Sequence, residues 1–200
     1  MKRVLCLLLS LSLLLVLTGC MSQEELQSRK EALTVLKGNS GDNYSLSTGT
    51  TLDNQTLYSD GNIVIQLAGI TGTPQSPTLR LAVRNGSRST ISMTVNSLVI
   101  NGWEMDGWLD LYDIPARTVT MSSIETSGDL TLCGVTDVVT VDLAFEIYDE
   151  DYNTVASVSC SMTTNSLEQV DTTLVPQGIT LLEEDGVTIK AVGNGTSLSL

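Results

Sequence analysis

The chain has 200 residues, with 23 acidic side chains against 10 basic ones and a formal net charge of −13. Nucleic-acid binding needs a basic face that neutralises phosphates, so this balance excludes that class; a polybasic contact with an anionic lipid surface is excluded on the same ground. Histidine is absent, which removes the Ser-His-Asp and Cys-His nucleophile arrangements, the His-ligated zinc sites and the commonest general base. We therefore expect a protein that is not an enzyme and that uses no cofactor and no metal.

The first 19 residues have the organisation of a secretory signal peptide. Lys2 and Arg3 precede an apolar run over residues 4–17, and small residues follow it. A basic start, a short apolar middle and a small-residue cleavage site define such a peptide. The alternative, a membrane-spanning helix, needs about 20 apolar residues, and this run is shorter. We therefore expect residues 1–19 to be absent from the mature protein.

The signal peptide ends in Leu17-Thr18-Gly19-Cys20, which resembles the lipobox of bacterial lipoproteins. The resemblance implies that a dedicated signal peptidase recognises Leu17, Thr18 and Gly19 and cuts before Cys20, whose sulfur receives a diacylglycerol. Two acyl chains anchor a protein stably, so the expected membrane partner is the lipid on Cys20. The expected location is the extracytoplasmic face of the cell membrane, or the outer membrane where the cell has two. The other interpretation is an ordinary cleaved signal with Cys20 as a structural thiol.

Residues 20–56 are predicted to form a lipidated N-terminus, a short helix and a flexible tether. Ser22 can cap a helix within residues 21–37, with acidic residues in its first turn and Gly38 as its stop. An unstructured stalk is the alternative. Gly, Ser, Thr, Asn and Asp dominate residues 38–56, and this composition is typical of flexible linkers.

Short runs rich in β-branched residues, separated by turn residues, occupy residues 57–173. Apolar and polar residues alternate within these runs, which predicts half-buried strands. The expected strands lie at residues 63–67, 79–83, 91–95, 98–100, 118–124, 130–132, 138–148 and 155–163. Strands of this length and spacing predict an all-β fold, a two-sheet antiparallel sandwich, with an open barrel as the alternative.

Two Asn-Gly pairs, Asn85-Gly86 and Asn101-Gly102, stand beside such runs and predict tight hairpin turns. Together with residues 83–87 and 144–149 they resemble the immunoglobulin-like modules of Firmicute-type lipoproteins. The resemblance covers residues 57–165. It implies an immunoglobulin-like fold and an envelope location, and it lends no catalytic residue.

The C-terminal residues 174–200 repeat a pattern found earlier in the chain. Residues 57–69 parallel residues 182–193, and in both copies a Gly-Thr pair and a Leu-x-Leu run follow. An internal repeat of this kind predicts an incomplete second module. The alternative is a C-terminal β-hairpin that completes the first domain.

Besides Cys20, the mature chain would keep two cysteines, Cys133 and Cys160. Each lies in an apolar run, where a free cysteine behaves as a small buried hydrophobe. An extracytoplasmic location would also permit a disulfide between them. We favour two buried thiols, because a disulfide requires Cα atoms that lie close together.

The candidate ligand site is the polar and aromatic stretch at residues 101–115. Its aromatic residues are Trp103, Trp108 and Tyr112, and its first two acids are Glu104 and Asp106. Exposed rings can stack on a sugar or another ligand while the carboxylates accept hydrogen bonds. The alternative, which we favour because tryptophan is highly buried on average, is a strand-turn-strand whose tryptophans cover one end of the sandwich.

These features predict a cell-envelope lipoprotein that acts as a non-catalytic binding or structural module. Its partner would be an envelope protein, a polysaccharide or a host ligand. One alternative is an accessory subunit that pairs with another protein's sheet edge through residues 174–200. A carbohydrate-active enzyme is the least favoured alternative, because no two carboxylates stand out as the paired acids of a glycosidase.

Overall fold

The computed structural model describes most of the chain after the signal peptide. The described residues are 21–38, 44–133 and 135–167, together with the strand backbones at 179–184, 187–193 and 198–199. The signal peptide, the lipobox residues Leu17, Thr18 and Gly19, and Cys20 lie outside the described residues.

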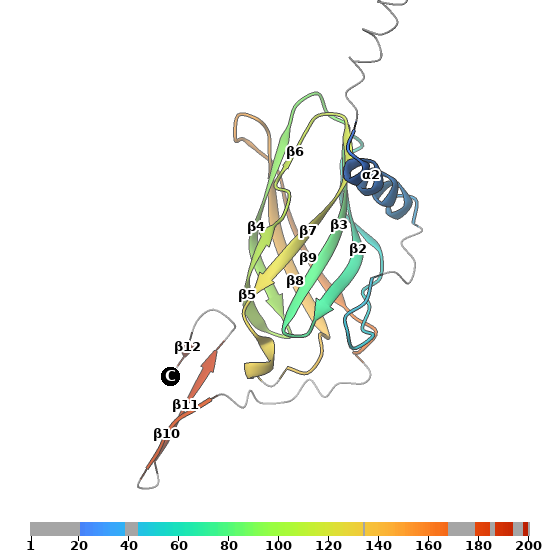
Figure 1. The fold of residues 1–200 in the computed structure, drawn as a ribbon. Coiled ribbons are helices and arrows are strands. Elements are labelled where there is room, and N and C mark those ends of the chain that lie inside the picture. Colours follow the sequence, from blue (N-terminus) through green and yellow to red (C-terminus); the bar gives the residue numbers. More distant parts are fainter. Residues whose placement is uncertain are drawn as a thin grey trace, which may run out of the picture.

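Antiparallel strands dominate the described residues, with one helix lying against them (Figure 1). The helical elements are α2 (Gln23–Val35) and the 3₁₀ helix η2 (Leu130–Cys133). The strands are β1 (Gln55–Ser59), β2 (Ile63–Thr73), β3 (Ser76–Asn85), β4 (Ile91–Ile100), β5 (Trp103–Leu109), β6 (Asp113–Ile114), β7 (Thr118–Ser127), β8 (Thr140–Tyr148), β9 (Thr154–Thr163), β10 (Ile179–Glu184), β11 (Val187–Gly193) and β12 (Leu198–Ser199). The prediction of a mostly β, antiparallel domain is therefore confirmed.

Strands β1 to β9 form one continuous sheet in the order β1-β2-β3-β7-β5-β4-β8-β9, with β6 paired to β4. β5 joins the two halves of this sheet, because residues 103–105 pair with β4 and residues 106–109 pair with β7. A strand that changes partner in this way makes a corner between two packed halves. The two sheets of the predicted sandwich are thus connected, and the open-barrel alternative describes the pairing better.

The sheet is nearly closed where the segment before β1 meets the segment after β9. Leu52 and Thr164 form an isolated antiparallel bridge. The backbone N–H of Asn165 donates to the carbonyl of Thr51 at 3.2 Å, and the side-chain oxygen of Asn165 accepts from the N–H of Thr51 at 2.9 Å. These bonds bring the two ends of the sheet together into a barrel.

The carboxylate of Asp137 fastens this closure. It accepts the hydroxyl protons of Thr50 and Ser166, at 2.6 and 2.7 Å, and that of Thr48 at 3.0 Å. The N–H of Val138 donates to it as well, at 2.9 Å. Burial of the carboxyl raises the pKa of Asp137, but these hydrogen bonds outweigh burial, and the net pKa is lowered. We call Asp137, Thr48, Thr50 and Ser166 the Asp137 cluster.

Residues 44–54 pack against the barrel, although the sequence suggested a flexible tether at this point. Leu46 and Leu52 are buried in the main core, and Tyr44 packs over Gly69 and donates its hydroxyl proton to Glu31. The polar side chains of this segment form hydrogen bonds at the closure of the barrel. Its composition resembles that of a flexible linker for this reason.

Helix α2 forms where the sequence predicted a short helix, and it lies on the outer side of β3 and β7 (Figure 1). Ser22 and Glu25 make a reciprocal capping box, with the N–H of Glu25 on Ser22 Oγ and the N–H of Ser22 on the Glu25 carboxylate. Ala32 and Val35 are buried against Ala68, Ala82 and Met121 of the sheet, which holds the helix in place.

Of the two predicted Asn-Gly hairpins, one forms and one does not. Asn101 and Gly102 both have positive φ, 52° and 83°, as a type I′ turn requires, and they join β4 to β5. β3 and β4 do not pair, because Asn85 is fully buried and donates to the carbonyls of Ser89 and Ile114, and the chain crosses between the two halves of the sheet. The predicted strand at residues 130–132 is instead part of η2.

The C-terminal strands β10, β11 and β12 form a separate three-stranded sheet in the described residues. β10 and β11 pair antiparallel as β1 and β2 do, and each pair shifts register once, between Thr180 and Leu182 and between Thr56 and Tyr58. Each pair thus has one bulge in its first strand. Because the sequence repeat aligns Leu57 with Leu182, the two bulges are offset by one residue, and the repeat extends to the strand pairing only in outline.

We expect the substitution Asp137→Asn to weaken the closure of the barrel. The neutral amide loses charge-assisted hydrogen bonds, so the free energy of unfolding in urea should fall by about 1–2 kcal/mol at neutral pH. Because the folded-state pKa of Asp137 is lowered, its contribution is present above the unfolded-state pKa, about 3.9, and is lost as the pH falls through the folded value. The difference between the two proteins should therefore shrink in acid.

The substitution Glu150→Gln, at an exposed acid in the turn after β8, is the control and should leave the free energy of unfolding unchanged. A difference between wild type and Asp137→Asn that stays constant into strong acid would contradict the role given to the carboxylate charge.

Candidate functional site

Strand β5 carries most of the sequence-predicted site residues and presents them on alternate sides. Met105 and Leu109 are buried, whereas Glu104, Asp106 and Trp108 are exposed. Successive side chains of a strand point to opposite faces. The three exposed residues therefore share the outer face of β5.

Gly107 lets β5 pack closely at the position where it changes partner. A Cβ atom at this position would lie 3.0 Å from Leu98 Cδ2 of β4 and 3.2 Å from Ile124 Cγ2 of β7. Both distances are shorter than ordinary van der Waals contact. The missing side chain thus allows one strand to contact both halves of the sheet.

The two tryptophans have different environments. Trp103 is half-buried and packs against the main core, as our favoured sequence interpretation expected for both rings. Trp108 is 46% exposed and lies opposite Glu125 of β7, which is itself exposed. Directly opposed residues on neighbouring strands share one face of the sheet. The structure therefore brings Glu125 to the site, although no local pattern in the sequence links it to Trp108.

Tyr112 lies beyond the end of β5, and its side chain is 61% exposed. Its carbonyl accepts from the N–H of Met93, so the backbone of this segment is fixed to β4. Asp110, between Trp108 and Tyr112, accepts from the N–H of Ser123 at 2.6 Å and from the hydroxyl of Ser122 at 2.9 Å. Burial raises the pKa of Asp110, but these bonds outweigh it and the net pKa is lowered. Asp110 therefore fixes the segment that follows β5 to β7.

We define the β5 face as Glu104, Asp106, Trp108 and Glu125. It combines an exposed indole with three carboxylates and contains no basic residue. Carboxylates accept hydrogen bonds from hydroxyl and ammonium groups, and indole attracts cations and the apolar faces of sugars. The β5 face therefore suits polyhydroxy or cationic ligands, and its negative charge disfavours anionic ones.

An open groove runs between α2 and the sheet, beside the segment that follows β5. Its lining residues are Gln23, Glu24, Gln27, Ser28, Glu31, Arg80, Asp110 and Met121. Arg80 is the one cation in this lining. The sequence analysis did not identify the groove, because the α2 side chains and Arg80 meet there only through the long-range packing of the helix on β3 and β7.

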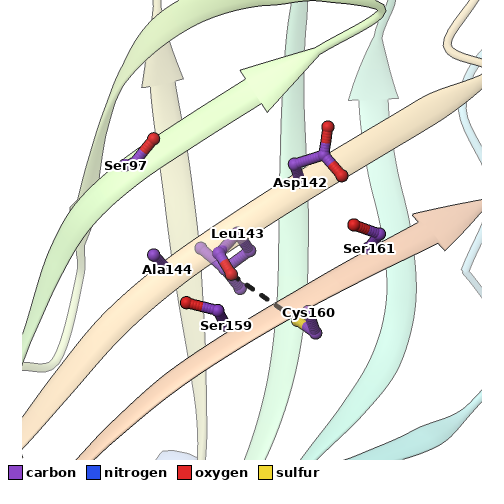
Figure 2. Close-up of a pocket in the computed structure, with 7 residues that line it drawn as sticks. All are labelled: Ser97, Asp142, Leu143, Ala144, Ser159, Cys160 and Ser161. Atoms are coloured by element: carbon purple, nitrogen blue, oxygen red, sulfur yellow. Dashed lines mark hydrogen bonds between the residues drawn. The ribbon is translucent and has the colours of Figure 1, made fainter.

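A second, smaller hollow lies over β8 and β9, where short side chains leave space (Figure 2). Ser159 and Ser161 flank Cys160, and Asp142 and Ala144 lie on the neighbouring strand. Cys160 is a free thiol whose Sγ lies 3.8 Å from the carbonyl oxygen of Leu143. Burial, and then the charge of Asp142, raise the pKa of this thiol, so it stays protonated at neutral pH. The side chain of Cys133 is outside the described residues.

The acidic turn after β8 is held by its own side chains. Asp149 accepts from the N–H groups of Asp151 and Asn153, each at 2.9 Å. Within the described ranges, no group of three or more His, Cys, Asp or Glu residues is placed to hold a metal ion. No helix in that part of the chain is long and apolar enough to cross a membrane.

We expect the two tryptophans to differ in their access to quenchers. The Trp103→Phe variant leaves Trp108, whose emission should be quenched by acrylamide several-fold more efficiently than the Trp103 emission of the Trp108→Phe variant. Because Glu125 lies opposite Trp108 and Asp106 lies two residues before it on the same face, the caesium cation should quench Trp108 more strongly than the iodide anion.

Equal quenching of Trp108 by caesium and iodide would contradict the arrangement of the β5 face. Since Trp103 contacts the core, circular dichroism of the Trp103→Phe variant serves as the folding control. The circular dichroism of the Trp108→Phe variant is compared with that of the wild-type protein in the same way.

Comparisons with known proteins place the chain only broadly. No protein-family model matches it, and no curated protein matches it. Among solved structures, the chain is similar to the crystal structure of the yeast GGA1 GAE domain, with 9% sequence identity and a TM-score of 0.35. The similarity covers 56% of this chain and 97% of that one. It is a likeness between two β-rich domains.

Proposed function

We propose that the protein is an extracytoplasmic lipoprotein, anchored by a diacylglycerol on Cys20, whose immunoglobulin-like domain is a non-catalytic binding module. The anchor rests on the lipobox at Leu17, Thr18, Gly19 and Cys20. The ligand is a polyhydroxy or cationic component of the envelope, either a polysaccharide or a protein.

The order of the strands supports the immunoglobulin-like part of the proposal. In constant-type immunoglobulin domains, the first, second, fifth and fourth strands form one sheet, and the third, sixth and seventh form the other. Here the corresponding groups are β2-β3-β7-β5 and β4-β8-β9, with β1 added at one edge. β5 occupies the position of the fourth strand and also reaches the second group.

One observation carries the binding function, namely the exposure of Trp108 among carboxylates. An indole that is 46% exposed on a regular strand leaves a large apolar area in water. Aromatic anchors surrounded by polar groups are typical of recognition surfaces. Tyr112, which is 61% exposed, adds a second aromatic side chain four residues further along.

The alternative is an accessory subunit of an envelope assembly. It is favoured by the C-terminal sheet, whose β10 and β11 repeat the antiparallel pairing and the single bulge of β1 and β2. In the barrel, β3 follows this pair of strands, and its residues 79–85 pair with β7. In the C-terminal sheet the third strand is β12, and it would pair in the same way with a strand of a partner protein.

We expect mass spectrometry of the protein purified from its native envelope to find a chain that begins at Cys20 and carries a diacylglycerol. A Cys20→Ser variant should keep its leader and lose the lipid, because the sulfur is the acceptor in the proposed modification. A native chain with an unmodified Cys20 or an intact leader would overturn the anchor.

We expect Trp108→Ala to reduce capture of an envelope component by the native protein at least several-fold. Tyr152→Asn is the matched control, because Tyr152 is an 81% exposed aromatic residue between β8 and β9, away from the β5 face, and its φ of 60° suits asparagine. Cross-linking in the native envelope, followed by identification of the captured component, is the measurement.

A chain that ends at residue 173 separates the two candidate functions. If this chain stays folded and keeps the captured component while Trp108→Ala loses it, the β5 face is the binding site. If the shortened chain loses the component and Trp108→Ala keeps it, the C-terminal sheet is the binding element and the first proposal fails.

A further inference from the structure

The outer side of α2 combines apolar and basic residues. Leu26, Lys30 and Leu33 of α2 recur at helical spacing with Lys37 in the turn that follows the helix, Arg29 lies beside them, and all five are exposed. The opposite side packs on the sheet through Ala32 and Val35 and hydrogen-bonds to it through Ser28. The outer side is therefore a continuous strip, which we call the α2 outer face.

The acids of the helix are turned away from the α2 outer face. The carboxylate of Glu25 reaches back to the N–H of Ser22 at 2.8 Å, within the capping box. Glu31 accepts the hydroxyl proton of Tyr44, and Glu24 lines the groove beside the sheet. The α2 outer face is thus locally cationic in a chain whose net charge is −13.

Exposed apolar side chains also lie on α2 and just before it. Eight large apolar residues are exposed in the described part of the chain, and Met21, Leu26 and Leu33 are three of them. Met21 Sδ lies 3.9 Å from Arg29 Nη1, so the apolar and basic groups are in contact. Exposed leucines flanked by Lys and Arg can enter the acyl boundary while the longer cationic side chains reach the lipid headgroups.

We propose that the α2 outer face lies on the surface of the anionic bilayer, with Leu26 and Leu33 at the acyl boundary and Arg29, Lys30 and Lys37 on lipid phosphates. This inference rests on the proposed anchor at Cys20. Only Met21 and Ser22 lie between Cys20 and Gln23, so the two residues are at most about 11 Å apart. The anchor therefore keeps α2 at a high effective concentration near the bilayer, where a weak surface contact is sufficient.

This contact sets the orientation of the barrel. Because α2 covers β3 and β7, the half of the sheet that contains β4, β8 and β9 points away from the bilayer (Figure 1). The overall charge argued against lipid binding by the chain as a whole, whereas the fold collects three of its cations on one exposed side.

The test uses the native, lipid-bearing protein reconstituted into phosphatidylcholine vesicles, with or without a minority of phosphatidylglycerol. The Leu33→Trp variant provides a reporter on the α2 outer face, and brominated acyl chains serve as the quencher. We expect the added emission to shift to shorter wavelength and to be quenched in the vesicles that contain phosphatidylglycerol. The double change R29E/K30E in this variant should reduce the population in contact about tenfold or more.

R88E is a control for charge reversal at another site, because Arg88 is an exposed cation in the loop after β3. Quenching that is equally weak with and without phosphatidylglycerol would overturn the proposal, as would an equal effect of R88E and R29E/K30E. Quenching that depends on an added envelope protein instead of phosphatidylglycerol would assign the face to a protein partner and also overturn it. The mass of residue 20 in the same sample shows independently whether the lipid is present. A missing anchor is thus distinguished from a missing contact between the α2 outer face and the bilayer.

Discussion

The structure depends on the closure of a single curled sheet by the Asp137 carboxylate. Thr48 and Thr50 precede β1 and Ser166 follows β9, so one carboxylate holds both ends of the sheet. The backbone carbonyl of Asp137 also accepts from the side-chain amide of Asn101, at 2.8 Å. Asn101 is the first residue of the turn that leads into β5. The closure of the barrel and the placement of the β5 face therefore share one group of hydrogen bonds.

Local sequence patterns predicted strands well and strand partners poorly. Alternation in β3 and β8 and the Asn101-Gly102 turn are properties of neighbouring residues, and they could be identified from the sequence. The failed hairpin at Asn85 has a long-range cause, because its amide donates to the carbonyl of Ile114 in a distant segment. Residues 44–54 were misjudged for the same reason, since their polar side chains meet partners more than eighty residues away.

The candidate site shows the same division between local and long-range information. Trp103 and Trp108 are five residues apart, an odd separation, so a continuous strand places them on opposite faces. Treating the stretch as one strand would have predicted their different exposure. Glu125 could not be predicted in this way, because its position beside Trp108 depends on the pairing of β5 with β7. The indole and two of the three carboxylates of the β5 face, Glu104 and Asp106, are thus products of local sequence, and the third carboxylate, Glu125, is a product of topology.

The packing of α2 has a consequence for the way the protein avoids self-association. β5 pairs with β7 only over residues 124–127, so part of the backbone of β7 lacks a strand neighbour on that side. Ser28 Oγ accepts the N–H of Met121 at 2.9 Å and thereby takes the place of such a neighbour. An uncovered strand edge is a template for aggregation. The helix next to the proposed anchor therefore also shields an edge at which two copies of the chain could otherwise join their sheets.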